Sequence, residues 1–178
     1  GVRGGLGEHF ADLQAALAYL SDQRGKSRVG LYGFSLGAAV ALLVAPKSSL
    51  VRAVVADSAF STLERMAKDN YRLFWVLQHP MAWLTLTLAR VYPGVDPWEV
   101  SPLEAVRGWD GPVLLIHGTA DSQIGVHHAR ELGEALRANP NAQVWLVEGA
   151  DHGQAVARFQ EAYQEKVLIF FTQYLREQ

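Results

Sequence analysis

Short apolar runs alternate along the chain with amphipathic stretches. Four of these runs, at 28–32, 51–56, 112–117 and 143–147, have the length and aliphatic content of buried strands. They show little of the polar alternation that marks a strand with one face in water. We therefore expect a mostly parallel sheet covered by helices on both faces.

The stretches between these runs have the spacing of helices, with apolar residues every three or four positions. The segment 38–45 is apolar throughout and is stopped by Pro46, so it predicts a buried helix. Strands alternating with helices predict an α/β fold with right-handed crossovers. The inward positions are Phe10, Leu13, Leu17 and Leu20 in the first helix, Ala129, Leu132 and Leu136 in a helix over 126–138, and Val156, Phe159, Tyr163, Val167, Phe170 and Tyr174 in a final helix.

The turn between the first strand and the buried helix is Gly-Phe-Ser-Leu-Gly, residues 33–37. A serine between two glycines on such a turn has the pattern of a nucleophile elbow. The turn strains the serine backbone, and side chains at Gly33 and Gly37 are expected to collide with neighbouring backbone. Ser35 would then stand above the sheet, with the Leu36 N–H at a helix start where it can stabilise an anion. A glycine-rich turn with an incidental serine is the alternative.

Two further polar residues follow the ends of later strands. Asp121 comes after the run 112–117, and His152 comes after the run 143–147. The carboxyl ends of parallel strands share one edge, so Ser35, Asp121 and His152 can converge there in the chain order serine, acid, histidine. Asp57, directly after the run 51–56, is the rival acid, since it too follows the end of a strand.

Three segments together resemble the α/β-hydrolase superfamily: 33–37, His-Gly-Thr-Ala-Asp at 117–121, and Gly-Ala-Asp-His-Gly at 149–153. The resemblance covers nearly the whole chain apart from its middle. It implies a serine hydrolase that cleaves an ester, thioester or related acyl bond of a small molecule through an acyl-enzyme on Ser35, without a cofactor. Asp121 lies in the better match to the family's acid segment, so it is favoured over Asp57. His117 would support the acid loop structurally. Ile124-Gly125 departs from the Val-Pro that the family often has, which loosens the following helix start.

The resemblance also implies earlier strands that these residues do not include. Residues 1–178 are therefore expected to form a single but partial domain, the C-terminal two-thirds of the fold. The strand before Ser35 would lie at a sheet edge, covered by preceding residues or by a second molecule. The family's second oxyanion donor comes from a loop after an earlier strand. The alternative function is thus a non-catalytic or incomplete hydrolase-fold module that lacks this donor.

The middle segment, 61–107, is expected to form a helical lid inserted in the domain. Its two apolar stretches, 73–77 and 82–89, are interrupted by Gln78-His79-Pro80 and are too short for a membrane span. Phe74, Trp75, Trp83 and Leu86 are candidates for lining the substrate site, as is Phe34 in the elbow. These lid side chains could instead pack the lid onto the core, and contact with lipid is a minor third possibility.

Charge and the remaining polar residues narrow the function further. The net charge of −2 over 178 residues does not suggest a nucleic-acid partner, and the chain has no cysteine for thiolate metal sites. The adjacent His127 and His128 raise the possibility of a metal. Neighbouring helical positions diverge and no acidic ligand lies at a metal-like spacing, so a helix-start role is preferred and no metal is expected. Asp151 is expected to accept local backbone hydrogen bonds.

Overall fold

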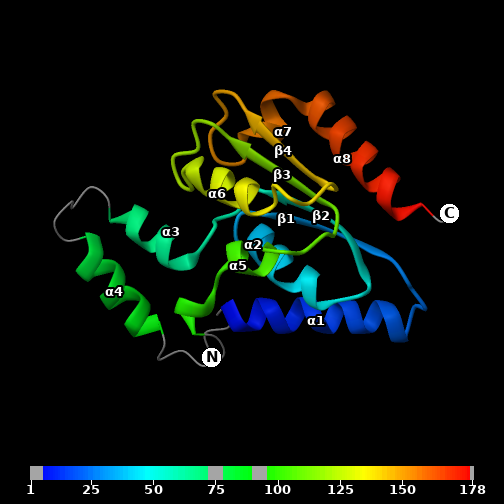
Figure 1. Ribbon diagram of the computed structural model, residues 1–178, viewed down its shortest axis with the longest axis horizontal. Coiled ribbons are helices and arrows are strands. Elements are labelled where there is room, and N and C mark those ends of the chain that lie inside the picture. The colour runs from blue at the N-terminus through cyan, green and yellow to red at the C-terminus, as the bar shows by residue number, and fades with distance from the viewer. Residues whose placement is uncertain (1–5, 72–77, 90–95, 177–178) are drawn as a thin grey trace.

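A computed structural model describes residues 6–71, 78–89 and 96–176, which form a parallel sheet with helices on both faces (Figure 1). The strands are β1 (Val29–Phe34), β2 (Val51–Asp57), β3 (Val113–Gly118) and β4 (Ala142–Val147). The helices are α1 (Leu6–Asp22), α2 (Leu36–Val44), α3 (Leu63–Asn70), α4 (Gln78–Ala89), α5 (Pro102–Val106), α6 (His127–Ala135), α7 (Gln154–Arg158) and α8 (Gln160–Leu175), with 3₁₀ turns η1 (Ala45–Lys47) and η3 (Pro97–Glu99). The predicted α/β class is confirmed.

The described strands form one sheet in the order β1-β2-β3-β4, and every neighbouring pair is parallel. All four carboxyl ends therefore lie at one edge, where the segments after β1, β3 and β4 bring the candidate catalytic residues. In this order β1 is an edge strand. The expectation that the strand before Ser35 lies at a sheet edge is met within the described residues.

The sheet buries both faces because successive side chains of a strand point to opposite sides. On β2, Val54 and Ala56 pack into a core with α1, α2, α5 and α6, whereas Ala53 and Val55 pack with α7 and α8. Strand β3 divides its side chains in the same way. This two-sided burial explains why the strands appear in the sequence as continuous apolar runs.

The segment 61–107 begins at the carboxyl edge of the sheet, because α3 follows β2 after a short connection (Figure 1). Helix α3 packs against α4, and both contact η3. The end of the segment belongs to the main core, since Val106 is fully buried there and α5 contacts α2 and α6.

The C-terminal stripe differs from the prediction of a single helix. The chain breaks at Phe159, whose φ of −130° and ψ of 45° are not helical, so α7 and α8 are separate helices. Tyr163 and Phe170 are buried in the sheet core, but Val156 and Phe159 are exposed. Val156 and Phe159 have the spacing of the buried stripe but do not face the core. The break at Phe159 separates them from α8, so they no longer share its buried face.

Candidate active site

Ser35 occupies a strained turn between β1 and α2. Its φ of 52° and ψ of −118° are unfavourable for a residue with a side chain. The Ser35 N–H donates to the Asp57 carbonyl at 2.8 Å, while the Ser35 carbonyl accepts the N–H groups of Ala38 and Ala39. The turn is thus held from β2 on one side and by the first turn of α2 on the other.

The two elbow glycines have different roles. A Cβ at Gly33 would lie 2.6 Å from Ala38 Cα and would also collide with the Gly37 carbonyl. A Cβ at Gly37 would meet no atom within 4 Å. The prediction of a collision at Gly37 is therefore wrong: Gly37 supplies the backbone that excludes a side chain from Gly33.

His152 lies between Ser35 and Asp121. Its Nε2 is 3.2 Å from Ser35 Oγ, and its Nδ1 is 2.8 Å from Asp121 Oδ2. The other carboxylate oxygen, Oδ1, accepts the N–H groups of Gln123 and Ile124 at 3.0 and 2.8 Å. Because these amides fix the carboxylate, Asp121 can orient the imidazole so that Nε2 faces the serine hydroxyl.

The loops that carry Asp121 and His152 are tied together. Asp151 Oδ1 accepts the Ser122 and His152 N–H groups at 2.8 and 2.7 Å, as its predicted loop role requires. These backbone hydrogen bonds, led by that from Ser122, lower the pKa of the exposed Asp151 carboxyl. The charge that links the two loops is therefore present at neutral pH.

His117 supports the acid loop from below. It is buried, and its Nε2–H donates to the Ile124 carbonyl at 2.7 Å. Burial lowers the pKa of His117, so the ring is neutral at pH 7. This contact agrees with the supporting role that the family resemblance implies.

Asp57, the rival acid, is engaged elsewhere. Its Oδ2 accepts from the Tyr163 hydroxyl at 2.7 Å and its Oδ1 from Ser58 Oγ at 2.9 Å. The Tyr163 hydroxyl also lies 2.8 Å from that of Tyr32, so a hydrogen-bonded chain joins α8, β2 and β1. Burial raises the pKa of Asp57 against the lowering effect of these hydrogen bonds. Sequence reasoning missed this network, because Tyr163 resembles any other residue of an apolar helical stripe.

The candidate substrate-lining residues lie in different environments. Phe34 is 42% exposed, and its ring centroid is 5.0 Å from that of His152, so it borders the site. Trp83 is 59% exposed on α4, whereas Leu86 is buried with Ala67 and Ala82 between α3 and α4. Leu86 thus matches the packing alternative. Phe74 and Trp75 fall outside the described residues.

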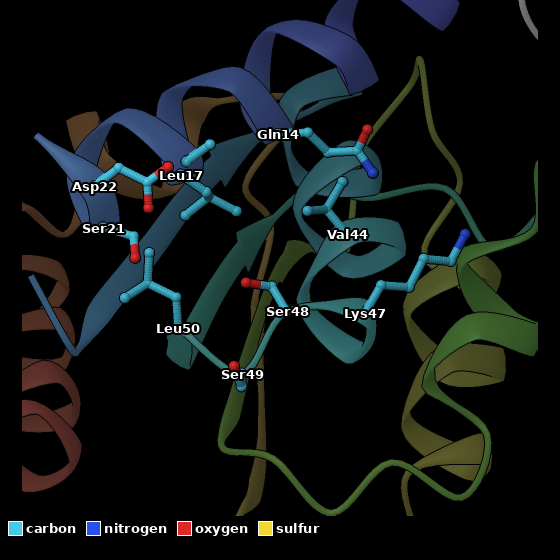
Figure 2. Close-up of a pocket in the computed structure, with 10 residues that line it drawn as sticks. Gln14, Leu17, Ser21, Asp22, Val44, Lys47, Ser48, Ser49 and Leu50 are labelled. Carbon is cyan, nitrogen blue, oxygen red and sulfur yellow. The ribbon is translucent and has the colours of Figure 1, made fainter.

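Two surface pockets lie at opposite ends of the strands, and one of them adjoins the candidate site. One pocket of about 380 Å³ lies between the C-terminal half of α1, the end of α2 and the segment before β2 (Figure 2). It is lined by Leu17, Val44 and Leu50 among others, at the end of the strands opposite Ser35. Another, of about 370 Å³, adjoins the elbow and is lined by Leu31, Tyr32 and Leu36. The second is the one next to the proposed oxyanion donor.

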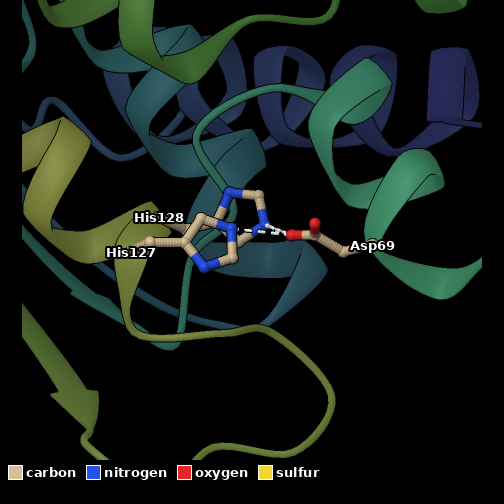
Figure 3. A group of neighbouring side chains, drawn as sticks. All are labelled: Asp69, His127 and His128. Atoms are coloured by element: carbon tan, nitrogen blue, oxygen red, sulfur yellow. Dashed lines mark ion pairs between the residues drawn. The ribbon is translucent and has the colours of Figure 1, made fainter. Parts of the chain in front are cut away.

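His127 and His128 lie at the start of α6, as predicted, but they also face a carboxylate. Asp69 Oδ2, from α3, is 2.7 Å from His127 Nε2 and 3.2 Å from His128 Nε2 (Figure 3). Burial, with the neighbouring His127, lowers the pKa of His128 to about 4. The sequence has no acidic residue at a metal-like spacing from these histidines, but the structure brings Asp69 to both of them from another helix. Local spacing carries no information about such a contact.

Comparison with known proteins identifies the family. The model of the prolyl oligopeptidase family, Peptidase_S9, matches residues 6–178. The chain belongs to this family. A curated relative, the uncharacterized protein YqkD of Bacillus subtilis (strain 168), is 28% identical over 166 residues, covering 89% of this chain and 53% of that protein. The chain thus spans about half the length of this relative.

Solved structures confirm the α/β-hydrolase fold. The Pyrococcus furiosus esterase Pf2001 matches with a TM-score of 0.75 at 24% identity, over 99% of this chain and 66% of that one. The esterase domain of a Rhodothermus marinus protein matches with a TM-score of 0.68 at 24% identity, over 94% of this chain and 69% of that one. The Pyrococcus horikoshii acylaminoacyl peptidase matches with a TM-score of 0.68 at 17% identity, over 95% of this chain and 28% of that one. Together with the family, these neighbours support a hydrolase.

No helix within residues 6–71, 78–89 and 96–176 combines the length and apolarity that crossing a bilayer requires.

Proposed function

We propose that this chain carries the catalytic centre of a serine hydrolase that cleaves an ester, thioester or related acyl bond through an acyl-enzyme on Ser35. The observation that carries the proposal is the continuous chain of contacts from Ser35 Oγ to His152 at 3.2 Å and on to Asp121 at 2.8 Å. The strained elbow supports it, because backbone strain of this kind is concentrated at functional sites.

The reaction follows from the roles of these groups. His152 Nε2 takes the Ser35 proton as Oγ attacks the acyl carbonyl, and Asp121 stabilises the imidazolium that forms. The oxyanion is stabilised by the Leu36 N–H at the start of α2. His152 then returns the proton to the leaving group, and water activated by the same ring hydrolyses the acyl-enzyme.

The substrate class is tested with a panel of p-nitrophenyl esters of increasing acyl length, beside aminoacyl anilides. We expect ester turnover together with covalent labelling by a fluorophosphonate probe, with medium apolar acyl chains preferred over acetyl. Turnover of aminoacyl anilides alone would indicate a peptidase rather than an esterase. The structural neighbours include both kinds of enzyme, so they do not decide between the two.

The alternative is a hydrolase-fold module without turnover. The observation that favours it is the position of β1 at the edge of the described sheet. On this strand Tyr32 is 52% exposed, and it lines the pocket next to Leu36. A protein that neither reacts with the fluorophosphonate nor turns over any ester or anilide would support this alternative.

We further propose that the segment 61–107 is a lid that sets acyl preference, with Trp83 as a contact residue. Because Trp83 is largely exposed, Trp83→Ala should change KM and chain-length preference while leaving the melting temperature nearly unchanged. The matched control is Leu86→Ala, which removes a buried side chain and should cost about 2–4 kcal/mol of stability. Unaltered selectivity in Trp83→Ala would show that this residue does not contact substrate.

A further inference from the structure

The three residues at the junction of α3 and α6 direct their donor atoms to one point. Asp69 Oδ2, His127 Nε2 and His128 Nε2 all lie within 4.8 Å of one another (Figure 3). Each of these atoms is buried, and none makes a hydrogen bond within the described part of the chain. Ion-pair distances of 2.7 and 3.2 Å join the two imidazoles to this one carboxylate oxygen, so a single atom serves two buried nitrogens. A cation between them would give all three atoms a common partner.

We infer that Asp69, His127 and His128 form a binding site for a divalent transition-metal ion that joins α3 to α6. Two imidazoles and one carboxylate are ligands that suit zinc and its neighbours better than calcium or magnesium, which prefer oxygen. The site is separate from Ser35, Asp121 and His152, and the proposal does not depend on the hydrolase activity.

The distances are close to those that coordination needs. With metal–ligand bonds of about 2.1 Å, tetrahedral ligand atoms lie about 3.4 Å apart. His128 Nε2 is already 3.2 Å from Asp69 Oδ2, whereas His127 Nε2, at 2.7 Å, must move outward by about 0.7 Å. The side chains of His127 and Asp69 are 32% and 25% exposed, so they have room to move and leave a path for the ion and for water ligands.

A second layer of residues orients His128. Its Nδ1 lies 2.8 Å from Ser61 Oγ, which donates to Glu131 Oε2 at 2.6 Å; the Ser61 N–H also reaches Nδ1, at 3.1 Å. The Ser61 N–H donates to Nδ1, so the ring proton lies on Nε2 as the structure stands. Metal binding at Nε2 requires the other tautomer, in which Ser61 Oγ accepts the Nδ1 proton and the Ser61 N–H gives up its contact with the ring. Carboxylate-backed partners of this kind are typical of histidines that bind metals.

Gly125 makes space for the other imidazole. A Cβ at this position would lie 2.7 Å from two atoms of the His127 ring. The glycine that replaces the family's usual proline therefore does more than loosen the helix start: it lets His127 fold back toward Asp69. Gly125→Ala should displace the ring and weaken metal binding without removing a ligand.

The test uses the 178-residue chain without a histidine tag, treated with EDTA and titrated with Zn²⁺ by calorimetry and thermal denaturation. We expect one Zn²⁺ per chain and a melting temperature that rises with Zn²⁺ concentration, whereas Ca²⁺ should have no such effect. Hydrogen exchange in α3 should slow on Zn²⁺ binding, because the ion fixes this helix on α6.

His127→Asn and Asp69→Asn should each weaken Zn²⁺ binding by about a hundredfold or more, given that even supporting residues contribute about 10–100-fold. His9→Asn, at an exposed histidine on α1, is the matched control and should bind Zn²⁺ as the parent does. Both ligand positions are partly exposed, so the variants should fold, which circular dichroism checks.

Two results would overturn the inference. Equal Zn²⁺ affinity in the parent, His127→Asn and Asp69→Asn would place the ion on other histidines. Absence of Zn²⁺ binding by the folded parent would show that no metal is held here. Asp69 would then simply accept hydrogen bonds from the two imidazoles and so hold α3 to α6.

Discussion

Ser35→Ala is expected to remove fluorophosphonate labelling and to lower kcat/KM for the best p-nitrophenyl ester by several orders of magnitude. The substitution deletes the nucleophile while leaving the strained backbone in place, so the fold should persist. His152→Ala should cause a loss of similar size, because without the imidazole the Ser35 hydroxyl keeps its proton. Losses of about 10⁴–10⁶ are typical when one member of such a unit is removed.

The double variant Ser35→Ala/His152→Ala distinguishes a concerted unit from two independent contributions. If the residues act together, the double variant should be little worse than either single one, since the remaining rate comes from binding and oxyanion stabilisation. Ser49→Ala is the matched control, because this exposed serine lies in the pocket at the opposite end of the strands (Figure 2). Labelling at Ser58 or Ser61 by mass spectrometry would overturn the assignment of Ser35.

The sequence predicts the sheet well because parallel strands must be buried on both faces. This requirement leaves a continuous apolar run in each strand, and all four described strands fall within two residues of their predicted positions. The C-terminal helix was harder to predict. Its spacing is correct throughout, but spacing cannot show that the backbone leaves the helical conformation at Phe159.

The convergence of Ser35, Asp121 and His152 was predictable because each follows a strand, and parallel strands end at one edge. Their catalytic roles remain predictions. Contacts between helices could not be predicted in this way. Asp69 meets His127 and His128, and Tyr163 meets Asp57, through the packing of α3 and α8, and no local spacing encodes either contact.

The same contacts bear on the choice of acid, for which Asp121→Asn is the decisive variant. The new amide can keep its oxygen toward the Gln123 and Ile124 N–H groups that hold Oδ1 now, which turns its NH₂ toward His152 Nδ1. Nδ1 must then accept, so the ring proton moves to Nε2, which can no longer take the proton of Ser35. We expect kcat to fall by about 10³–10⁴ with the melting temperature little changed.

Asp57→Asn is the matched control for this loss. Its amide oxygen can still accept from Tyr163, and the structure shows no hydrogen bond between Asp57 and His152 among the described residues. Because an uncharged side chain suits a buried site, this variant should keep most of the turnover and much of the stability. For both variants, kcat and KM are measured with the same ester, and the melting temperature is measured by thermal denaturation. Near-normal turnover in Asp121→Asn together with inactivity in Asp57→Asn would reverse the assignment, and would mean that His152 turns toward β2 in the working enzyme.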